Sequence, residues 1–441
     1  MFSDPQGTKI FMPNTDHKLT LDSLFYKPLS EVYDLSDHQR KCPEITDLDY
    51  LRMGVERCLG QYRSGHDFLQ NHTKEDGKKV AVGHFFHELA SKRRLANLTS
   101  VNEAFLPYLR DHLTDELAQI EELKGWHLYA GDGHYQKAAV FDEKRASDTG
   151  TRKASKTATG HFFRLDLRTH HLGYLDLAQP DDGKKSEHDM KMLKRQEMET
   201  LQAGAKKGQK VLYLWDRASI DYAFWNKAKS QKGVYFATLA KSNSVMNKIR
   251  VLFDLDYTDK RNQGIHSDDL VETSEGYELR RIIYTNPRDG KQYTYLTNQK
   301  TLSAWILVLL YKHRWDIEKV FDEFKTKLGE QKSWASSVEA KKSHAYFLCL
   351  LHNLMLLAEE DAKTNHGLED VVEQKKQATR EKTKLTGSRA KLPPNYINSF
   401  FKRASQRTFR FIRWLRYHVQ NKSSVCRAMD DLAAIWGCKL T

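Results

Sequence analysis

The sequence predicts a mixed α/β fold with a β insertion and with helical regions toward both ends of the chain. Short apolar runs alternate with helical patterns between residues 126 and 239, as in proteins whose helices cover a mixed sheet. Residues 241–300 instead hold short strand patterns and turn-forming sequences, which indicates an inserted β subdomain. Elsewhere, apolar residues recur at three- and four-residue spacing, which is typical of helices.

The first 120 residues or so carry helical patterns and no strand-like alternation. Apolar residues at helical spacing predict helices over Tyr50–Tyr62 and His84–Leu95. Thr99 and Ser100 precede a third pattern, Val101–Leu113, so we expect another helix there. No residue pattern in this region indicates catalysis.

The predicted sheet begins with a short apolar strand, Trp126–Ala130. The segment Gly131–Gly133 follows, and its two glycines are expected to let the backbone turn sharply and leave the Asp132 carboxylate exposed. Two further strand-like runs, His161–Thr169 and Leu172–Ala178, predict a hairpin.

A helix is predicted from Ser186, its cap, to about Ala203. The next run, Val211–Trp215, is uninterrupted and apolar, as expected of a strand buried on both faces, and it ends at Asp216. A helix over Ile220–Lys229 and a buried strand over Val234–Leu239 complete this part. Two of the central strands therefore end in an aspartate, at the edge where open α/β sheets usually place their sites.

Beyond the insertion, helices are predicted from Ser303 to about Leu328 and over Ala340–Glu360. These patterns divide the chain into five parts: a helical N-terminal region (1–122), the first part of the core (123–240), the β insertion (241–300), the second part of the core (301–365) and a basic C-terminal region (366–441).

The charge of the protein is concentrated near its C-terminus. The net charge of the 441 residues is +13, and residues 371–441 alone contain 16 Lys and Arg against 4 Asp and Glu, a difference of +12. Such a region implies a polyanionic partner, for which nucleic acid is the first expectation, although a basic surface also serves solubility alone. The run Phe400–Arg416, here called the C-terminal basic run, interleaves rings with cations. On a helix it is expected to turn its rings inward and its cations outward toward phosphates, the alternative being an ordinary basic amphipathic helix.

Composition excludes several other classes of protein. With 39% hydrophobic and 11% aromatic residues the chain is expected to be globular, and no apolar run reaches the roughly 18 residues of a membrane helix. The first ten residues hold no apolar stretch, so we expect no secretory signal. The five cysteines are odd in number and include no CxxC pair, which argues against a disulfide framework or a zinc site and suits a reducing cytoplasm.

The most informative segment is Tyr311–Lys325, taken as a single helix. With Tyr311 set at 0° and about 100° per residue, Arg314 falls near 300°, Glu318 near 340° and Lys325 near 320°. This polar stripe borders the apolar face of the helix instead of lying opposite to it, which favours a site at a domain rim. An alternative is that Arg314 and Glu318 form an i,i+4 ion pair that only stabilises the helix.

The three acids of this pattern also have alternatives. Asp132 between its glycines can be a turn residue, and Asp216 can pair with the adjacent arginine. Asp221 is a rival to Asp216, and Asp322 is a rival to Glu318 because it lies one helical turn further on.

Three carboxylates with cations beside them suit phosphoryl chemistry on a nucleic acid. Two divalent ions about 4 Å apart can activate a water molecule and stabilise the leaving oxygen of a phosphodiester. Mg²⁺ prefers oxygen ligands, and Arg or Lys can hold neighbouring phosphates, Arg with two parallel hydrogen bonds.

The spacing Tyr311-x2-Arg314-x3-Glu318-x6-Lys325 resembles the YREK signature of insertion-sequence-four-type DDE transposases at every position. Asp132 and Asp216 occur in the order of the two aspartates of that family. The resemblance covers roughly residues 123–360 and implies a ribonuclease-H-like fold with a β insertion before the last catalytic helix.

The resemblance also implies roles for single residues. Asp132 would bridge two Mg²⁺ ions, with Mn²⁺ able to replace them, and Asp216 and Glu318 would each complete one metal site. Tyr311, Arg314 and Lys325 would hold phosphates near the transposon end. The enzyme would hydrolyse DNA at the ends of a transposable element and join the resulting 3′-OH to target DNA, as a homodimer in the synaptic complex. The N-terminal region would bind terminal DNA, and the C-terminal region would bind DNA or a second protomer.

Two other hypotheses belong to different classes. One is a DNA-binding regulator derived from a transposase that has lost catalysis, which the presence of all three acids disfavours. The other is a Mg²⁺-dependent nuclease with the same metal site and no strand transfer.

Overall fold

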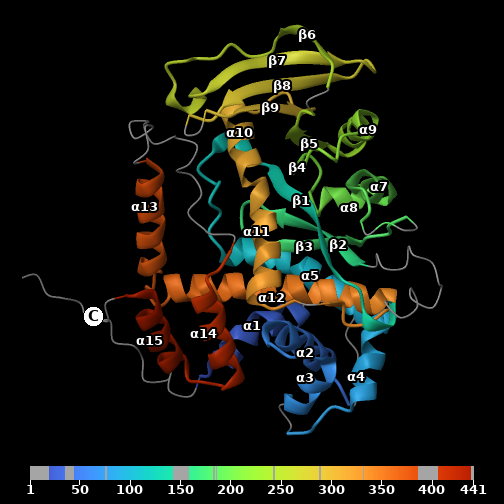
Figure 1. The fold of residues 1–441 in the computed structure, drawn as a ribbon, viewed down its shortest axis with the longest axis vertical. Coiled ribbons are helices and arrows are strands. Elements are labelled where there is room, and N and C mark those ends of the chain that lie inside the picture. Colours follow the sequence, from blue (N-terminus) through green and yellow to red (C-terminus); the bar gives the residue numbers. More distant parts are fainter. Residues whose placement is uncertain are drawn as a thin grey trace, which may run out of the picture.

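The computed structural model describes residues 19–34, 44–74, 77–142, 158–181, 184, 186–241, 244–287, 290–330, 332–385 and 406–438. The strands gather into a single sheet, with the inserted strands at one end of the molecule and the N-terminal helices at the other (Figure 1). None of the described helices is long and apolar enough to cross a membrane.

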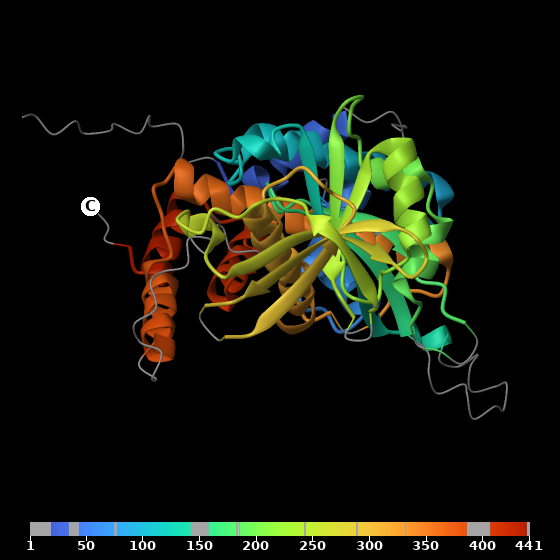
Figure 2. The ribbon, with the colours of Figure 1, turned by 90° about the horizontal axis from the view of Figure 1, so that it is seen from above.

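The sheet has nine strands and mixes parallel with antiparallel pairs. Its strands are β1 (Trp126–Lys137), β2 (Ala158–Asp166), β3 (Leu172–Leu177), β4 (Lys210–Leu214), β5 (Val234–Leu239), β6 (Met246–Val251), β7 (Ile265–Thr273), β8 (Glu278–Thr285) and β9 (Gln292–Thr297). They lie in the order β3-β2-β1-β4-β5-β9-β8-β7-β6. β1, β4 and β5 run parallel, and β2 and β3 form the predicted hairpin, so the mixed α/β fold is confirmed. Seen from above, the strands fan out with the usual twist (Figure 2).

The four strands of the predicted insertion extend this same sheet. β9 is hydrogen-bonded to the last core strand, β5, in an antiparallel register that sets Ala237 opposite Thr297. β8, β7 and β6 follow outward from β9. The insertion is thus attached through backbone hydrogen bonds beside the ends of β4 and β5, where the predicted site lies.

Both faces of the central strands are buried, as their uninterrupted apolar sequences predict. Along β4, Leu212 and Leu214 belong to one hydrophobic core, whereas Val211 and Tyr213 belong to another on the opposite face. The first core is shared with the N-terminal helices and α12 (Val338–Thr364), and the second with α7 (Asp189–Arg195), α8 (Met198–Gln202) and α9 (Tyr222–Lys232). The helix predicted from Ser186 to Ala203 is therefore two shorter helices.

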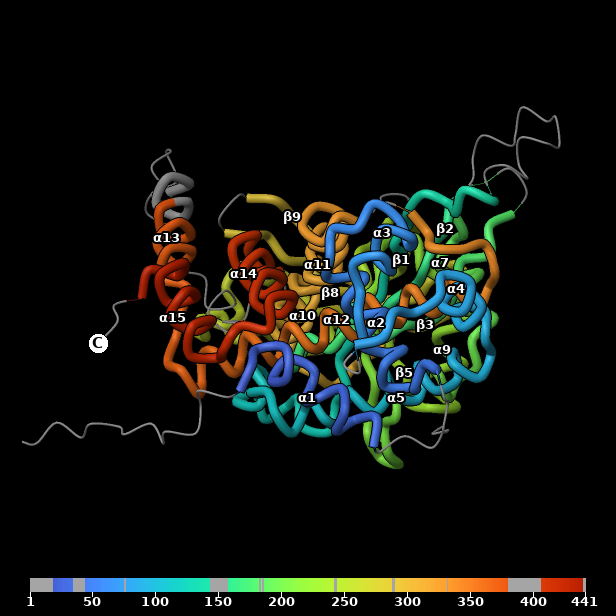
Figure 3. The backbone as a smooth tube through the Cα atoms, turned by 90° about the horizontal axis from the view of Figure 1, so that it is seen from below, coloured from blue at the N-terminus to red at the C-terminus, as the bar shows by residue number. Residues whose placement is uncertain are grey.

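The N-terminal helices are α1 (Leu21–Asp34), α2 (Asp47–Leu59), α3 (Gly65–Asn71), α4 (Val82–Leu89) and α5 (Lys92–His112). α1, α2, α4 and α5 pack against α12. α14 (Phe409–Gln420) and α15 (Val425–Trp436) lie beside α1, and α13 (Val371–Leu385) contacts α15 (Figure 3). The boundary predicted at Thr99 and Ser100 is wrong. α5 runs through both residues because Ser91, at its start, accepts a hydrogen bond from the backbone of Arg94.

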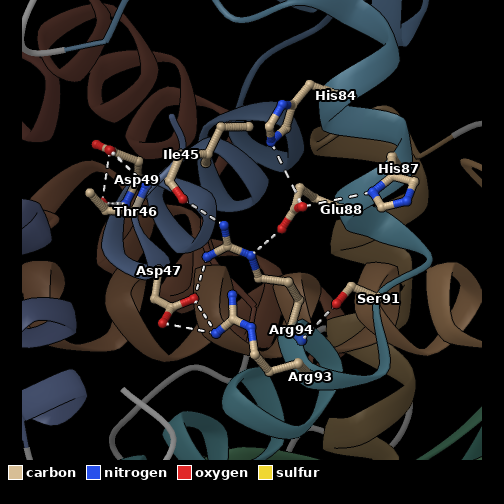
Figure 4. A network of polar contacts seen from close by, with 10 residues as sticks. All are labelled: Ile45, Thr46, Asp47, Asp49, His84, His87, Glu88, Ser91, Arg93 and Arg94. Carbon is tan, nitrogen blue, oxygen red and sulfur yellow. Dashed lines mark hydrogen bonds and ion pairs between the residues drawn. The ribbon is translucent and has the colours of Figure 1, made fainter. Parts of the chain in front are cut away.

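A buried charge network joins α2 to α5 (Figure 4). Arg94 is 1% exposed, and its guanidinium contacts the carboxylates of Asp47 and Glu88 and donates to the Ile45 carbonyl at 2.6 Å. Arg93 adds a second donor to Asp47 at 2.8 Å. Every charge of the network has a partner, so its role is to hold the helices together.

Candidate active site

Asp132 lies on β1, and Asp216 lies in the segment just after β4, the neighbouring parallel strand. The register of the two strands pairs Ala130 with Leu214, the last residue of β4. Asp132 and Asp216 each follow the last paired residue of their strand by two positions. Strand alternation directs Asp132 to the face of Leu128 and Ala130, over which the helical segment after residue 313 packs.

The strand of Asp132 does not end where the sequence predicted. β1 continues to Lys137, because β2 pairs with it from Tyr129 to Lys137. This register sets Phe163 opposite Asp132. Gly131 has a packing role instead of a turn role. A β-carbon at this position would lie 2.5 Å from the indole ring of Trp215, so only glycine lets the two strands approach with that ring between them.

The segment after β4 is fixed by three hydrogen bonds. An Asp216 carboxylate oxygen accepts from the Ala218 N–H at 2.7 Å, and the Asp216 carbonyl accepts from the Thr238 hydroxyl at 2.8 Å. Tyr311 donates its buried hydroxyl to the Trp215 carbonyl at 3.0 Å. The sequence predicted phosphate contact for Tyr311, whereas in the structure its hydroxyl holds the residue next to Asp216.

The segment 311–325 is not one regular helix, contrary to prediction. α10 (Ala304–Lys312) leads into a 3₁₀ turn (His313–Trp315), α11 (Asp316–Asp322) and a π-helical turn (Glu323–Lys327). Such irregular turns change the rotation per residue about the helix axis. A uniform 100° per residue therefore does not place Tyr311, Arg314, Glu318 and Lys325 on one stripe. Lys325 is exposed on the π-helical turn.

Arg314 connects α11 with the aspartates. Its Nη2 donates to Glu318 Oε1 at 2.7 Å, and its Nη1 lies 3.9 Å from Asp132 Oδ2. Its side chain is only 6% exposed and stacks on the half-exposed Trp315 ring with its central carbon 5.0 Å from the ring centre. Nε and Nη1 are buried and lack a hydrogen-bond partner among the described residues. The predicted i,i+4 pair therefore exists, but the guanidinium also faces Asp132 with unused donors.

Burial and neighbouring acids act together on Asp132. Burial raises the pKa of Asp132 to about 7, and the charges of Asp189 and Glu318 add to this effect, while the Gly133 N–H and Arg314 oppose it. Burial also raises the pKa of Asp189, and the charge of Asp216 adds to it. Asp132 is thus within electrostatic reach of Asp189 and Glu318, and Asp189 is within reach of Asp216.

Asp189 is the acid that sequence reasoning missed. It is the first residue of α7 and accepts a hydrogen bond from the Ser219 hydroxyl at 3.0 Å. The sequence signal was weak, because an acid in the first turn of a helix is commonplace. Only the packing of α7 against the end of β4 gives Asp189 its acidic neighbours.

The two rival acids have structural partners. Asp221 caps α9 by accepting from the Phe224 N–H at 2.8 Å and pairs with Lys194 at 2.5 Å. Asp322 is exposed and accepts from Gln406 at 2.7 Å.

The donor set fits a hard divalent cation. Within the described ranges no three Asp, Glu, His or Cys side chains stand close enough to ligate one ion. Arg314 contacts both Asp132 and Glu318. The residues nevertheless supply only carboxylate oxygens, which Mg²⁺ prefers, and their mutual repulsion is what a bound cation would relieve.

The C-terminal basic run was predicted to turn its cations outward toward phosphates, and several of its described cations are instead bound by the protein. Its first residues, 400–405, lie outside the described residues. Arg407 is 3% exposed and pairs with Glu323 of the π-helical turn at 3.2 Å. Arg410 pairs with Asp370 at 3.1 Å, and Arg416 donates to two backbone carbonyls. Arg413 is exposed, as predicted, whereas acids and carbonyls far away in the sequence bind the other three cations.

Comparison with known protein families gives a match over the middle of the chain. Residues 165–354 match the family model described as Transposase DDE domain. The match supports a DDE transposase. It spans β2 to α12 and includes Asp216 and the whole segment 311–325, whereas Asp132 lies before it. A family of this kind implies an enzyme that binds DNA and cleaves or joins its strands. No curated protein matches the chain.

Proposed function

We propose that this protein is a cut-and-paste DNA transposase of the insertion-sequence-four type. The observation that carries the proposal is the contact of the Arg314–Glu318 pair with Asp132, nearly two hundred residues away, together with Asp189, which is within electrostatic reach of both Asp132 and Asp216. The partial family match supports the same conclusion. The YREK residues supply the type, because their spacing is complete in this chain.

Asp132, Asp216 and Glu318 are the proposed metal ligands, with Asp132 as the central one because the charge of Glu318 acts on it and Arg314 contacts both. When bound, two Mg²⁺ ions, or Mn²⁺ in their place, would supply a polarised water and charge neutralisation at the leaving oxygen. Arg314 would use its free Nε and Nη1 donors for a phosphate of the substrate strand. Lys325 would add a second, exposed cation, and Tyr311 would keep the segment after β4 in position.

The proposed reaction has two steps on the same site. Hydrolysis at the end of the element releases a 3′-OH, and that hydroxyl then attacks a phosphodiester of the target. The protein holds the attacking and leaving groups in line and excludes bulk water through the partly buried setting of Asp132. We further propose that the five parts predicted from the sequence divide the work, with residues 1–122 and 366–441 contacting DNA or a second protomer of a synaptic homodimer in the cytoplasm.

Cleavage of DNA that carries the element's own ends tests the proposal. The full chain should cut this DNA with Mg²⁺ and not with a chelator, and should join the cut ends to a plasmid target. Asp132→Asn, Asp216→Asn and Glu318→Gln should each stop cutting while binding to the same DNA persists. Cutting without joined product would favour a nuclease, and binding without cutting by the unaltered chain would favour a regulator that has lost catalysis.

A further inference from the structure

A polar cavity of about 370 Å³ lies beside the candidate active site, between the catalytic core and the inserted strands. Its walls come from three places: the residue after Asp216, the connection that leaves β5, and the facing parts of β8 and β9. Its lining includes Arg217, Lys241, Arg281, Gln292, Tyr293 and Thr294. The walls are thus held in place by the backbone pairing of β5, β9 and β8.

The cavity is positively charged. Arg217, Lys241 and Arg281 contribute three cations, and its described lining includes no acid. Arg217 and Lys241 are exposed, so their charges are available to a ligand at the mouth of the cavity. Cations converging from separate segments of the chain recognise an anion rather than stabilise one element.

Arg281 gives the cavity a fixed donor. Its Nη2 donates to Asp269 at 3.1 Å, and Asp269 is shared with Lys248 at 2.6 Å. These contacts restrain the guanidinium, whereas its Nε is buried and has no hydrogen-bond partner within the described part of the chain. A restrained guanidinium with an unused N–H is suited to a phosphate oxygen.

We propose that this cavity binds one backbone phosphate of the DNA strand that enters the active site, next to the phosphodiester that is cut. The proposal rests on the proposed function. The position follows from the chain, since Arg217 is adjacent to Asp216. Gln292, Tyr293 and Thr294 offer hydrogen-bonding groups and a ring to the attached sugar and base. The insertion would thereby hold the strand in register with the carboxylates.

Binding measured against salt tests the proposal on the full chain. For a duplex that carries the element's end, the slope of log affinity against log salt should fall by about 1 in the Arg217→Gln/Lys241→Gln double variant, because one phosphate contact is lost. That change corresponds to about tenfold weaker binding at 0.1 M salt. Lys227→Gln is the matched control, because Lys227 is an equally exposed cation on α9 outside the cavity, and its slope should equal that of the unaltered protein.

Neutral methylphosphonate substitutions, placed one at a time in the duplex, locate the contact. In the unaltered protein one position near the cut should weaken binding about tenfold, and in the double variant the same substitution should cost nothing further. An unchanged salt slope, or equal losses from the substitution in both proteins at every position, would overturn the proposal. Arg281→Gln is a second variant with the same expectation, provided its thermal unfolding matches that of the unaltered protein.

Failure of the proposed function gives a different pattern. Suppose that the unaltered chain binds the duplex but never cuts it with Mg²⁺, and that the double variant loses one phosphate contact. The cavity proposal then stands and the catalytic proposal falls. If it cuts normally and the slope does not change, the catalytic proposal stands and the cavity proposal falls. A chain that does not bind the duplex refutes both.

Discussion

Asp132 and Asp166 lie on two neighbouring strands of one sheet, yet the pKa values of their carboxyl groups are shifted in opposite directions. Burial alone would raise the pKa of Asp166, but Arg110 at 2.9 Å and the N–H groups of Arg168 and Thr169 outweigh it and lower the pKa. Asp132 keeps a pKa raised to about 7 by burial, because Arg314 stays 3.9 Å away.

The two carboxyl groups therefore serve different purposes. Both oxygens of the fully buried Asp166 carboxylate accept hydrogen bonds, which stabilises the fold. Around Asp132, three residue pairs further along the same two strands, several acids are gathered with too little positive charge, which costs stability. Such poorly compensated acids are characteristic of functional sites.

The largest expected effect comes from removing the Asp132 charge. Asp132→Asn should lower DNA cleavage by at least about a thousandfold, because the carboxylate most central to the site is lost. The free energy of unfolding should stay equal or rise slightly, since a buried charge with acidic neighbours disappears. Cleavage assays and chemical denaturation of the same preparation measure both quantities.

Asp132→Asn that cuts DNA at a normal rate would remove this residue from the site. Asp221→Asn is the matched control, because Asp221 caps α9 nearby and is expected to affect stability without abolishing cleavage.

Removal of the Asp166 charge should show the opposite result. Asp166→Asn should lower the free energy of unfolding by about 3 kcal/mol, because Arg110 and two buried N–H groups lose their charged partner. Cleavage per folded molecule should change little. A fall in cleavage as large as that of Asp132→Asn, at unchanged stability, would mean that the two carboxyl groups do not differ in purpose.

Much of this fold could be predicted from local patterns. The apolar run Val211–Trp215 predicted a strand covered on both faces, and the runs His161–Thr169 and Leu172–Ala178 predicted a hairpin, because both signals depend on neighbouring residues alone. Asp132 was singled out for the wrong local reason, however. Its two glycines were interpreted as a turn, whereas β2 and the Trp215 ring determine that the strand continues.

The parts that the sequence could not predict depend on partners distant in the chain. Asp189 gains its acidic neighbours only when α7 packs beside β4, and no spacing rule connects these elements. The C-terminal basic run behaves similarly, since Glu323 and Asp370 bind cations that a helical projection turns outward. Helical periodicity also fails in segment 311–325, where 3₁₀ and π turns interrupt α10 and α11.

Two buried histidines provide a pH-dependent test of stability. Burial lowers the pKa of both His161 and His171 to about 3. At pH 7 both are neutral in the folded and the unfolded chain, so they cost nothing. Below about pH 6.5 each histidine binds a proton in the unfolded chain but stays neutral in the folded chain. Each histidine should therefore lower the free energy of unfolding by about 2 kcal/mol between pH 7 and pH 5.

Denaturation at the two pH values measures this loss. His171→Asn should reduce the difference in stability between pH 7 and pH 5, whereas His87→Asn should not, because the His87 side chain is 85% exposed. If the His171→Asn protein loses as much stability on acidification as the unaltered one, His171 is already able to accept a proton in the folded state.

The smallest expected effect concerns Tyr311. It separates two roles for this residue in the candidate site: positioning the segment of Asp216 and contacting DNA. Tyr311→Phe should cost about 1 kcal/mol of stability, because the Trp215 carbonyl loses its hydroxyl donor. If Tyr311 only positions the segment of Asp216, cleavage should slow several-fold while the salt dependence of DNA binding stays unchanged. Arg314→Ala and Lys325→Ala, by contrast, should each flatten that dependence, since both are expected to touch phosphate. A flatter slope for Tyr311→Phe would instead mean that its hydroxyl leaves Trp215 for the DNA, and that the site rearranges when substrate binds.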